Sequence, residues 1–250
     1  MESTALTMAS LSLSLNESSV VNHGVGEDVV RGFRDAAAEV FVMPAEKKLP
    51  YWLDYLKLQA RLAEFSEAVD ELAQTLLRLV AEGLGLGADF FTGDLSGGDT
   101  QMNVNYYPPC PDPSLTLGLL PHCDRHLLTV LSQGDVAGLQ ARHIGRWLLV
   151  RPIPGALVIN FGHQMEIITN GALASVEHRA VTNSDRTRMS VATLIMPKME
   201  CRIGPAPEMV NEATNPAKFR KFVFIEFSEA YYTAAASRED VLEFFRIHAN

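Results

Sequence analysis

The sequence predicts a mixed α+β fold, with a barrel or jelly roll of short strands between an N-terminal and a C-terminal set of helices. Between residues 101 and 205, short apolar segments rich in β-branched or aromatic residues alternate with turn-forming residues. Many short strands at this spacing are typical of barrels and jelly rolls. On both sides of this region, apolar residues recur every three or four positions, which indicates helices.

The composition is that of a globular protein and disfavours several classes of partner. With 250 residues and 47% hydrophobic residues, the chain can bury a large core. A net charge of −9 argues against nucleic acid or an anionic membrane as the main partner. No apolar run approaches the roughly 18 residues that span a bilayer. We expect a small-molecule partner.

The cysteines and the first residues predict a cytoplasmic protein. Cys110, Cys123 and Cys201 are far apart, odd in number and form no CxxC pair, so a disulfide framework or structural zinc site is not expected. Three cysteines without an expected disulfide are typical of a protein in a reducing compartment. The segment Met1–Val20 has no basic start typical of a signal peptide and is interpreted as a Ser-rich leader.

Residues 1–100 are expected to form an N-terminal helical region. A short strand is predicted at Val20–Val25, followed by a helix over Glu27–Val42 that Pro44 stops. A second, longer helix is predicted from an apolar stripe whose steps alternate between three and four residues. The stripe contains Leu62, Phe65, Val69, Leu72, Leu76, Leu79 and Val80, and the glycines at 83, 85 and 87 end it. Packing against a sheet is the favoured role, with a coiled-coil partner as the alternative.

Residues 101–205 are expected to form the jelly-roll core, and residues 206–250 a C-terminal helical region packed on it. The predicted strands are Val104–Tyr107, Leu127–Leu131, Trp147–Val150, Ala156–Phe161 and Met189–Met196. A helix rich in aromatic residues is predicted from about Pro216 through Tyr232, followed by an amphipathic segment at Asp240–His248.

Three residues in this core have the pattern of a metal site. On a strand, alternate side chains share a face, so His122 and Asp124 would point the same way and Cys123 the opposite way. His178 lies far along the chain on another predicted strand. Two imidazoles and one carboxylate form the facial triad of non-haem iron(II) oxygenases. Alternatively, the three could be unrelated polar residues at strand ends.

Two further pairs suggest a site for an acidic cosubstrate. Arg188 and Ser190 are two apart on a predicted strand, and a guanidinium beside a hydroxyl suits a carboxylate. Asn105 and Tyr107 likewise share a face and offer hydrogen-bond donors. The alternatives are a surface ion pair for Arg188 and ordinary packing for Asn105 and Tyr107.

With these motifs, the sequence resembles the plant 2-oxoglutarate- and iron(II)-dependent dioxygenases. The motifs that carry the resemblance are NHGV, NYYPPCP, HCD, NFGHQMEIITNG, SVEHRAVTN and RMS, and the match is nearly continuous from about residue 84 to 205. The resemblance implies a double-stranded β-helix that holds Fe(II) through His122, Asp124 and His178. It also implies that Arg188 and Ser190 bind the distal carboxylate of 2-oxoglutarate, with Tyr107 and Asn105 near the other end.

The same resemblance implies hydroxylation or desaturation of a small metabolite of plant secondary metabolism. Dioxygen is consumed, 2-oxoglutarate is decarboxylated to succinate, and ascorbate serves as reductant. The most similar subgroup is the enzymes that hydroxylate deoxymugineic acid, together with the tropane hydroxylases. His126 is weighed as a substrate contact, His143 and His163 as surface or supporting residues, and His23 as a structural residue.

The chain is shorter than members of that family, which leaves a second hypothesis open. One segment before NHGV and another near residues 44–58 are expected to be missing. The alternative is therefore a truncated, catalytically poor relative that binds metal or cosubstrate and acts as a regulatory protein. We expect a monomer, with association possible through a sheet edge exposed by a lost N-terminal strand.

Overall fold

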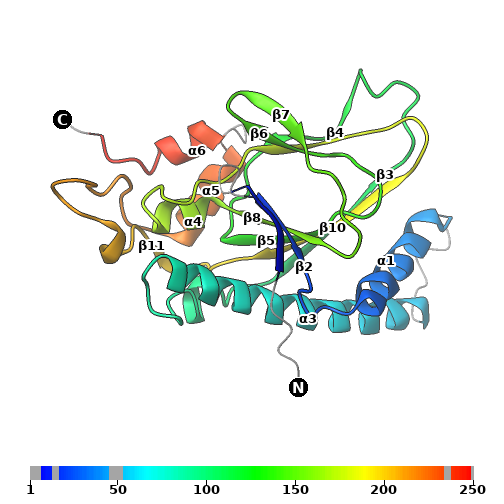
Figure 1. The fold of residues 1–250 in the computed structure, drawn as a ribbon, viewed down its shortest axis with the longest axis horizontal. Helices are drawn as coiled ribbons and strands as arrows, with labels where there is room; N and C mark the ends of the chain where they lie inside the picture. The colour runs from blue at the N-terminus through cyan, green and yellow to red at the C-terminus, as the bar shows by residue number, and fades with distance from the viewer. Residues whose placement is uncertain (1–6, 13–16, 45–52, 234–237, 249–250) are drawn as a thin grey trace.

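The computed structural model describes residues 7–12, 17–44, 53–233 and 238–248. Two antiparallel sheets form a jelly roll, and the long helix α3 runs along one side of it (Figure 1). The helices α5 and α6 lie at one end (Figure 1). The predicted α+β jelly roll flanked by helices is confirmed.

The larger sheet has six strands in the order β1-β2-β8-β5-β10-β3. These strands are β1 (Thr7–Ser12), β2 (Glu17–Val21), β8 (Leu157–Phe161), β5 (Leu128–Ser132), β10 (Arg188–Ile195) and β3 (Gln101–Tyr107). All the core strands predicted here are confirmed within three residues at each end.

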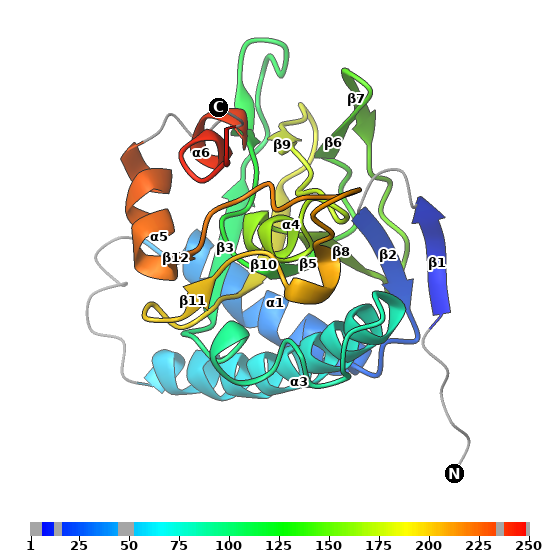
Figure 2. The same ribbon diagram turned by 90° about the vertical axis from the view of Figure 1, so that its left-hand side faces the viewer.

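The N-terminal residues differ from the expected leader. β1 and β2 form a hairpin at one edge of the larger sheet, and β2 pairs with β8 (Figure 2). The sequence analysis expected a lost N-terminal strand to leave a sheet edge exposed; in the structure, β2 covers the edge of β8 and β1 is the outermost strand. The other expected deletion, near residues 44–58, lies largely on residues 45–52, outside the described part of the chain.

The smaller sheet has four strands in the order β4-β9-β6-β7. They are β4 (Leu117–His122), β9 (His178–Val181), β6 (Leu139–His143) and β7 (Arg146–Leu149). The sequence analysis did not delimit β4 or predict β6. β4 carries a proline and a glycine, and β6 is short and half polar, so neither has the apolar pattern of a buried strand.

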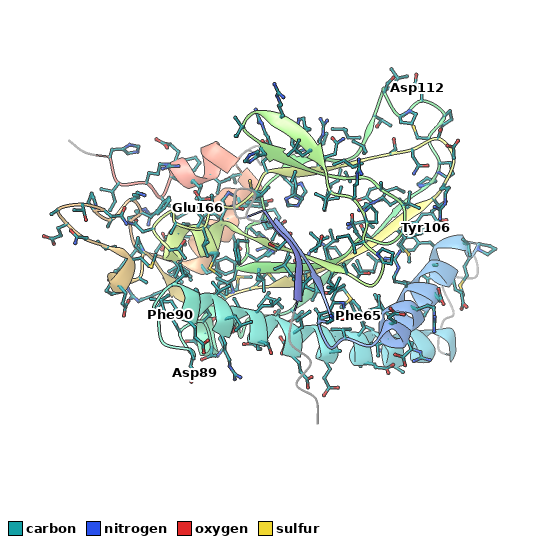
Figure 3. The ribbon with its side chains drawn as sticks, viewed as in Figure 1. Phe65, Asp89, Phe90, Tyr106, Asp112 and Glu166 are labelled. Carbon is teal, nitrogen blue, oxygen red and sulfur yellow. The ribbon has the colours of Figure 1, made fainter. Side chains whose placement is uncertain are left out.

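The first two helices pack on each other. α1 (Glu27–Val42) has the predicted bounds, and α3 (Leu53–Gly83) contains the predicted stripe. Phe33 of α1 stacks on Phe65 of α3 with ring centroids 5.0 Å apart, and Figure 3 shows Phe65 where α3 lies beside α1. Both side chains are buried. Four members of the stripe, Phe65, Val69, Leu72 and Leu76, lie in the hydrophobic core together with residues of the larger sheet, as the sheet-packing interpretation predicted, whereas Leu62 and Leu79 are exposed.

The glycines after α3 end it as the sequence analysis predicted. Gly85 adopts a positive φ of 73°, which is unfavourable for residues with a Cβ. The amide of Leu86 then donates to the carbonyl of Ala81, and the amide of Gly85 to that of Glu82. These two bonds are the Schellman arrangement that satisfies the last carbonyls of a helix.

The C-terminal region corrects one prediction. The helix expected from Pro216 begins only at Phe224, because Phe222 lies on a short strand and the amide of Phe224 donates to the carbonyl of Cys201. The helices of this region are α5 (Phe224–Thr233) and α6 (Arg238–Glu243).

Several short elements of the chain were not predicted from the sequence. They are α4 (His163–Ile168), β11 (Arg202–Ile203), β12 (Phe222–Val223) and two 3₁₀ turns at Gly93–Leu95 and Pro207–Met209.

The two faces of the larger sheet have different surroundings. On β3, Met102 and Val104 join the hydrophobic core that contains α3, whereas Asn103 and Asn105 line a cavity inside the jelly roll. β5 and β10 alternate in the same way, because successive side chains of a strand point to opposite faces. The apolar residues thus attach the sheet to α3, and the residues between them are free to form a polar site.

We expect Phe65→Ala to lower the free energy of unfolding by about 3 kcal/mol, because it removes a buried ring at the contact of α1 and α3. Urea unfolding measures this. Leu79→Ala, on the same helix but 50% exposed, is the control and should change the free energy by less than about 0.5 kcal/mol. Equal losses in both variants would contradict this packing.

Candidate metal centre and adjoining pocket

The cavity inside the jelly roll has a volume of about 270 Å³ and is lined by both sheets and by α5. All seven residues singled out from the sequence line it: Asn105, Tyr107, His122, Asp124, His178, Arg188 and Ser190. Other polar residues of the wall include Gln101, Asn103, Arg125, His126, Thr129, Asn160, Arg179, Tyr231 and Tyr232. The structure therefore brings residues that are up to 85 positions apart in the chain to one site.

His122, Asp124 and His178 offer three ligand atoms that lie within 4.8 Å of one another. His122 on β4 is paired with His178 on β9. The Nε2 atoms of the two imidazoles lie 3.7 and 3.8 Å from Oδ1 of Asp124. β4 ends at His122, so Asp124 shares the site from the following loop and not, as predicted, from the same strand.

Each of the two imidazoles is oriented by a hydrogen bond at its other ring nitrogen. The Nδ1 atoms of His122 and His178 lie 2.8 and 3.0 Å from the carbonyls of Leu120 and Val176. With a proton on Nδ1, each imidazole directs the lone pair of Nε2 into the site. Such outer partners orient the ligands of a metal.

The carboxylate of Asp124 is oriented in the same manner. The hydroxyl of Thr129 and the side-chain amide of Asn160 donate to its Oδ2 at 2.5 and 2.8 Å. Thr129 on β5 and Asn160 on β8 are register partners, so two adjacent strands position both donors. Oδ1 is left facing the two histidines.

Electrostatics favour the ionised form of Asp124. Burial alone would raise its pKa, but the neighbouring imidazoles of His126, His178 and His122 together hold the pKa well below its usual range. Burial lowers the pKa of His122, as does the proximity of His178. An ionised carboxylate is the form that binds a divalent metal.

The neighbouring residues have supporting or structural positions. Cys123 is fully buried, with Sγ 3.9 Å from the carbonyl of Ser175, and does not line the cavity. His126 lines the cavity, but its Nε2 lies 2.6 Å from the Thr129 hydroxyl, so it supports the Asp124 carboxylate. His163 is buried beside the ring of Phe227, which excludes a surface position. His23 bonds the carbonyl of Gly155, in keeping with a structural role.

The residues expected at a cosubstrate lie beside this centre on two paired strands. β10 and β3 place Arg188 opposite Tyr107, and Ser190 opposite Asn105. The guanidinium carbon of Arg188 lies 5.3 Å from the centre of the Tyr107 ring, and its Nη1 lies 3.4 Å from Oγ of Ser190. Arg188 is therefore not a surface residue, and the alternative of a surface ion pair is wrong.

The charge of Arg188 has no counter-ion among the described residues. Its side chain is 2% exposed, and its Nε has no hydrogen-bond partner there. Burial lowers the pKa of this guanidinium, although Tyr107 opposes the effect. A buried cation is costly unless it is paired, so this position requires an anionic ligand.

Two glycines make room for the side chains of Arg188 and Tyr107. A Cβ on Gly138 would lie 2.6 Å from Cδ of Arg188, and a Cβ on Gly118 would lie 2.7 Å from the Tyr107 ring. The sequence analysis missed both glycines, as well as Thr129 and Asn160. Thr129 and Asn160 alternate with apolar residues on their strands, which is the only signal in the sequence that could have identified them.

The residues present fit a mononuclear metal and an acidic ligand next to it. Two nitrogens and one oxygen on one side of a site are the donor set of non-haem iron(II) enzymes, and they leave further coordination positions open. The guanidinium of Arg188, which has no counter-ion among the described residues, suits a carboxylate in the same cavity.

Comparisons with known proteins agree with this chemistry. Residues 98–197 match the 2OG-Fe(II) oxygenase superfamily. Mugineic-acid 3-dioxygenase of Hordeum vulgare is 40% identical over 255 residues, which cover 85% of this chain and 75% of that enzyme. Hyoscyamine 6-dioxygenase of Hyoscyamus niger is 32% identical over 284 residues, or 92% and 82% of the two chains.

A solved structure is similar over the whole fold. The crystal structure of JOX2 in complex with 2OG, Fe and JA has a TM-score of 0.85 and 28% sequence identity, and the match covers 94% of this chain and 83% of that one. The family prediction is confirmed, and the alternative of a catalytically poor binding protein is not favoured. The chain belongs to the 2OG-Fe(II) oxygenase superfamily and is an oxidoreductase that depends on Fe(II) and 2-oxoglutarate.

Proposed function

We propose that this enzyme oxidises a small organic metabolite, with Fe(II) held by His122, Asp124 and His178. The observation that carries the proposal is the position of three ligand atoms beside a buried arginine that has no counter-ion among the residues described. When bound, iron and 2-oxoglutarate supply dioxygen activation coupled to decarboxylation of the 2-oxo acid to succinate, which hydroxylates or desaturates a C–H position.

The protein residues orient these groups and exclude water. Thr129 and Asn160 keep Oδ1 of Asp124 directed toward the histidines. Arg188 and Ser190 would bind the distal carboxylate of 2-oxoglutarate, and Tyr107 covers the guanidinium. Asn105, opposite Ser190 on β3, would contact the same molecule. A fixed cosubstrate leaves the rest of the cavity for the metabolite.

The biological setting is proposed from the relatives. Their names describe dioxygenases of plant metabolites, so we assign this chain to plant secondary metabolism, with ascorbate as reductant. Among the described residues, no helix is both long and apolar enough to cross a bilayer. We place the enzyme in the cytoplasm as a monomer. Light scattering of the purified protein tests the monomeric state.

The direct test of the function is turnover. Incubation with Fe(II), ascorbate and 2-oxoglutarate should release succinate, and a panel of metabolites should contain one whose mass changes by the gain of one oxygen or the loss of two hydrogens. Absence of succinate formation with Fe(II) bound would contradict the proposal.

We expect Asp124→Ala to abolish tight metal binding, because two imidazoles alone remain. Isothermal titration calorimetry with Mn(II), a redox-stable substitute for Fe(II), measures the affinity. Cys123→Ala is the matched control, since its thiol does not line the cavity, and should bind as the wild type does. Wild-type affinity in the Asp124 variant would refute the assignment.

Thr129→Val removes one donor to Asp124 and keeps the shape of the side chain. Loss of such an outer partner weakens metal affinity by about 10- to 100-fold. The same Mn(II) titration measures it, with Thr193→Val as control, because Thr193 is buried on β10 but does not line the cavity. Equal affinities in wild type and Thr129→Val would show that the hydroxyl does not support the ligand.

Arg188→Lys keeps the charge but loses the planar pair of donors. A charge-assisted bond is worth about 1.5–3 kcal/mol, so the dissociation constant for 2-oxoglutarate should rise by about tenfold or more. Ser190→Ala should have a smaller effect. Titration of the Mn(II)-loaded protein with 2-oxoglutarate decides this, and an unchanged constant in Arg188→Lys would place the cosubstrate elsewhere.

A further inference from the structure

A second arginine lines the cavity and has only neutral partners among the described residues. Arg125 directly follows Asp124, and its Nη1 donates to the hydroxyl of Ser228 on α5 at 2.6 Å. Its Nη2 donates to Oε1 of Gln101 on β3 at 3.3 Å. The guanidinium carbon lies 5.2 Å from the centre of the Tyr232 ring. These contacts hold a cation at the wall of the cavity without neutralising it.

The charges that the proposed function brings together leave this cation unbalanced. Within the described part of the chain, Asp124 is the only residue of the cavity lining with a carboxylate. A divalent iron and Arg188 together carry three positive charges, and Asp124 with the dianion of 2-oxoglutarate carries three negative charges. The metal and cosubstrate sites are thus neutral as a whole, so the other two arginines of the lining, Arg125 and Arg179, remain as surplus positive charges.

The third arginine of the lining, Arg179, has neutral partners outside the cavity, whereas two partners of Arg125, Gln101 and Tyr232, line it. Arg179 donates through Nε to Gln140 at 2.7 Å, and its guanidinium lies 4.3 Å from the ring centre of Trp147. Gln140 and Trp147 belong to β6 and β7, and neither lines the cavity. Arg179 therefore provides a matched comparison for a charge at the border of the same cavity.

We propose that Arg125 binds a carboxylate of the metabolite, so that the substrates of this enzyme are small organic acids. This inference rests on the proposed function and adds a substrate class to it. An arginine offers several N–H donors in one plane, and the two bonds to neutral partners fix that plane without using all of them. Arg125 lines the same cavity as His122, Asp124 and His178, so the bound acid would share that cavity with the metal centre.

If Arg125 had a purely structural role, its substitution would have a different effect. As a link between the loop after β4 and α5, it would matter for stability but not for the charge of a ligand. Arg125→Gln and Ser228→Ala would then have similar effects, because both remove the 2.6 Å bond between these residues. As a substrate contact, Arg125→Gln abolishes selectivity for acids, whereas Ser228→Ala retains it.

The experiment compares acids with their neutral amides on the protein loaded with Mn(II) and 2-oxoglutarate. The probes are phenylacetate, 3-phenylpropionate and cyclohexanecarboxylate, each paired with its carboxamide, and calorimetry measures binding. We expect the wild type to bind at least one acid about tenfold or more tighter than its amide. Arg125→Gln should lose this preference, Arg125→Lys should retain part of it, and Arg179→Gln should keep it.

Several results would overturn the inference. These are equal binding of acids and amides, no binding of any acid by the wild type, or equal losses in Arg125→Gln and Arg179→Gln. The preceding titrations with Mn(II) and 2-oxoglutarate test the proposed function separately. If those fail, the comparison of acids and amides is made on the unloaded protein, where a preference that depends on Arg125 still supports the binding site.

Discussion

The alternation of side chains along β3, β5 and β10 is the constraint on which the rest of the structure depends. One set of alternate residues is apolar and packs toward α3, so the register of each strand is fixed by burial. The residues between them must then point into the jelly roll. A shift by one residue would place Arg188 and Ser190 against the helix and valines in the cavity. The same packing that stabilises the sheet therefore assembles the polar site.

The site contains buried polar groups whose hydrogen-bonding and charge requirements are not met by the described residues alone. The buried Nε of Arg188 has no partner in the described part of the chain, and three ligand atoms lie within 4.8 Å of one another. Unpaired buried polar groups oppose folding, whereas a ligand that binds only the folded state stabilises it. Metal and cosubstrate thus complete the interior of the jelly roll as well as providing its chemistry.

The sequence allowed the strands with apolar alternation, the helix α1 and the seven candidate residues to be predicted, because each follows from a short local pattern. Other features depend on contacts between distant segments. Asp124 reaches the site from a loop that is held where the amide of His163 donates to its carbonyl. The segment before Phe224 is extended because Phe222 pairs with Ile203, although its aromatic residues suggested a helix. Thr129 and Asn160 both donate to Asp124 because β5 and β8 are paired, and this pairing joins segments distant in the sequence.

The chemistry and the proposed selectivity have different structural origins. The ligands and Arg188 lie on or next to strands within residues 98–197, the part that matches the superfamily. The partners of Arg125 include Ser228 and Tyr232, which lie on α5 outside that part. Changes at these two positions of α5 can therefore alter how Arg125 is held, whereas Tyr231 of the same helix donates to the carbonyl of Cys123 at 2.8 Å and supports the loop that carries Asp124. An oxidising centre shared by a whole family can in this way acquire a different substrate through the helix that closes one end of its cavity.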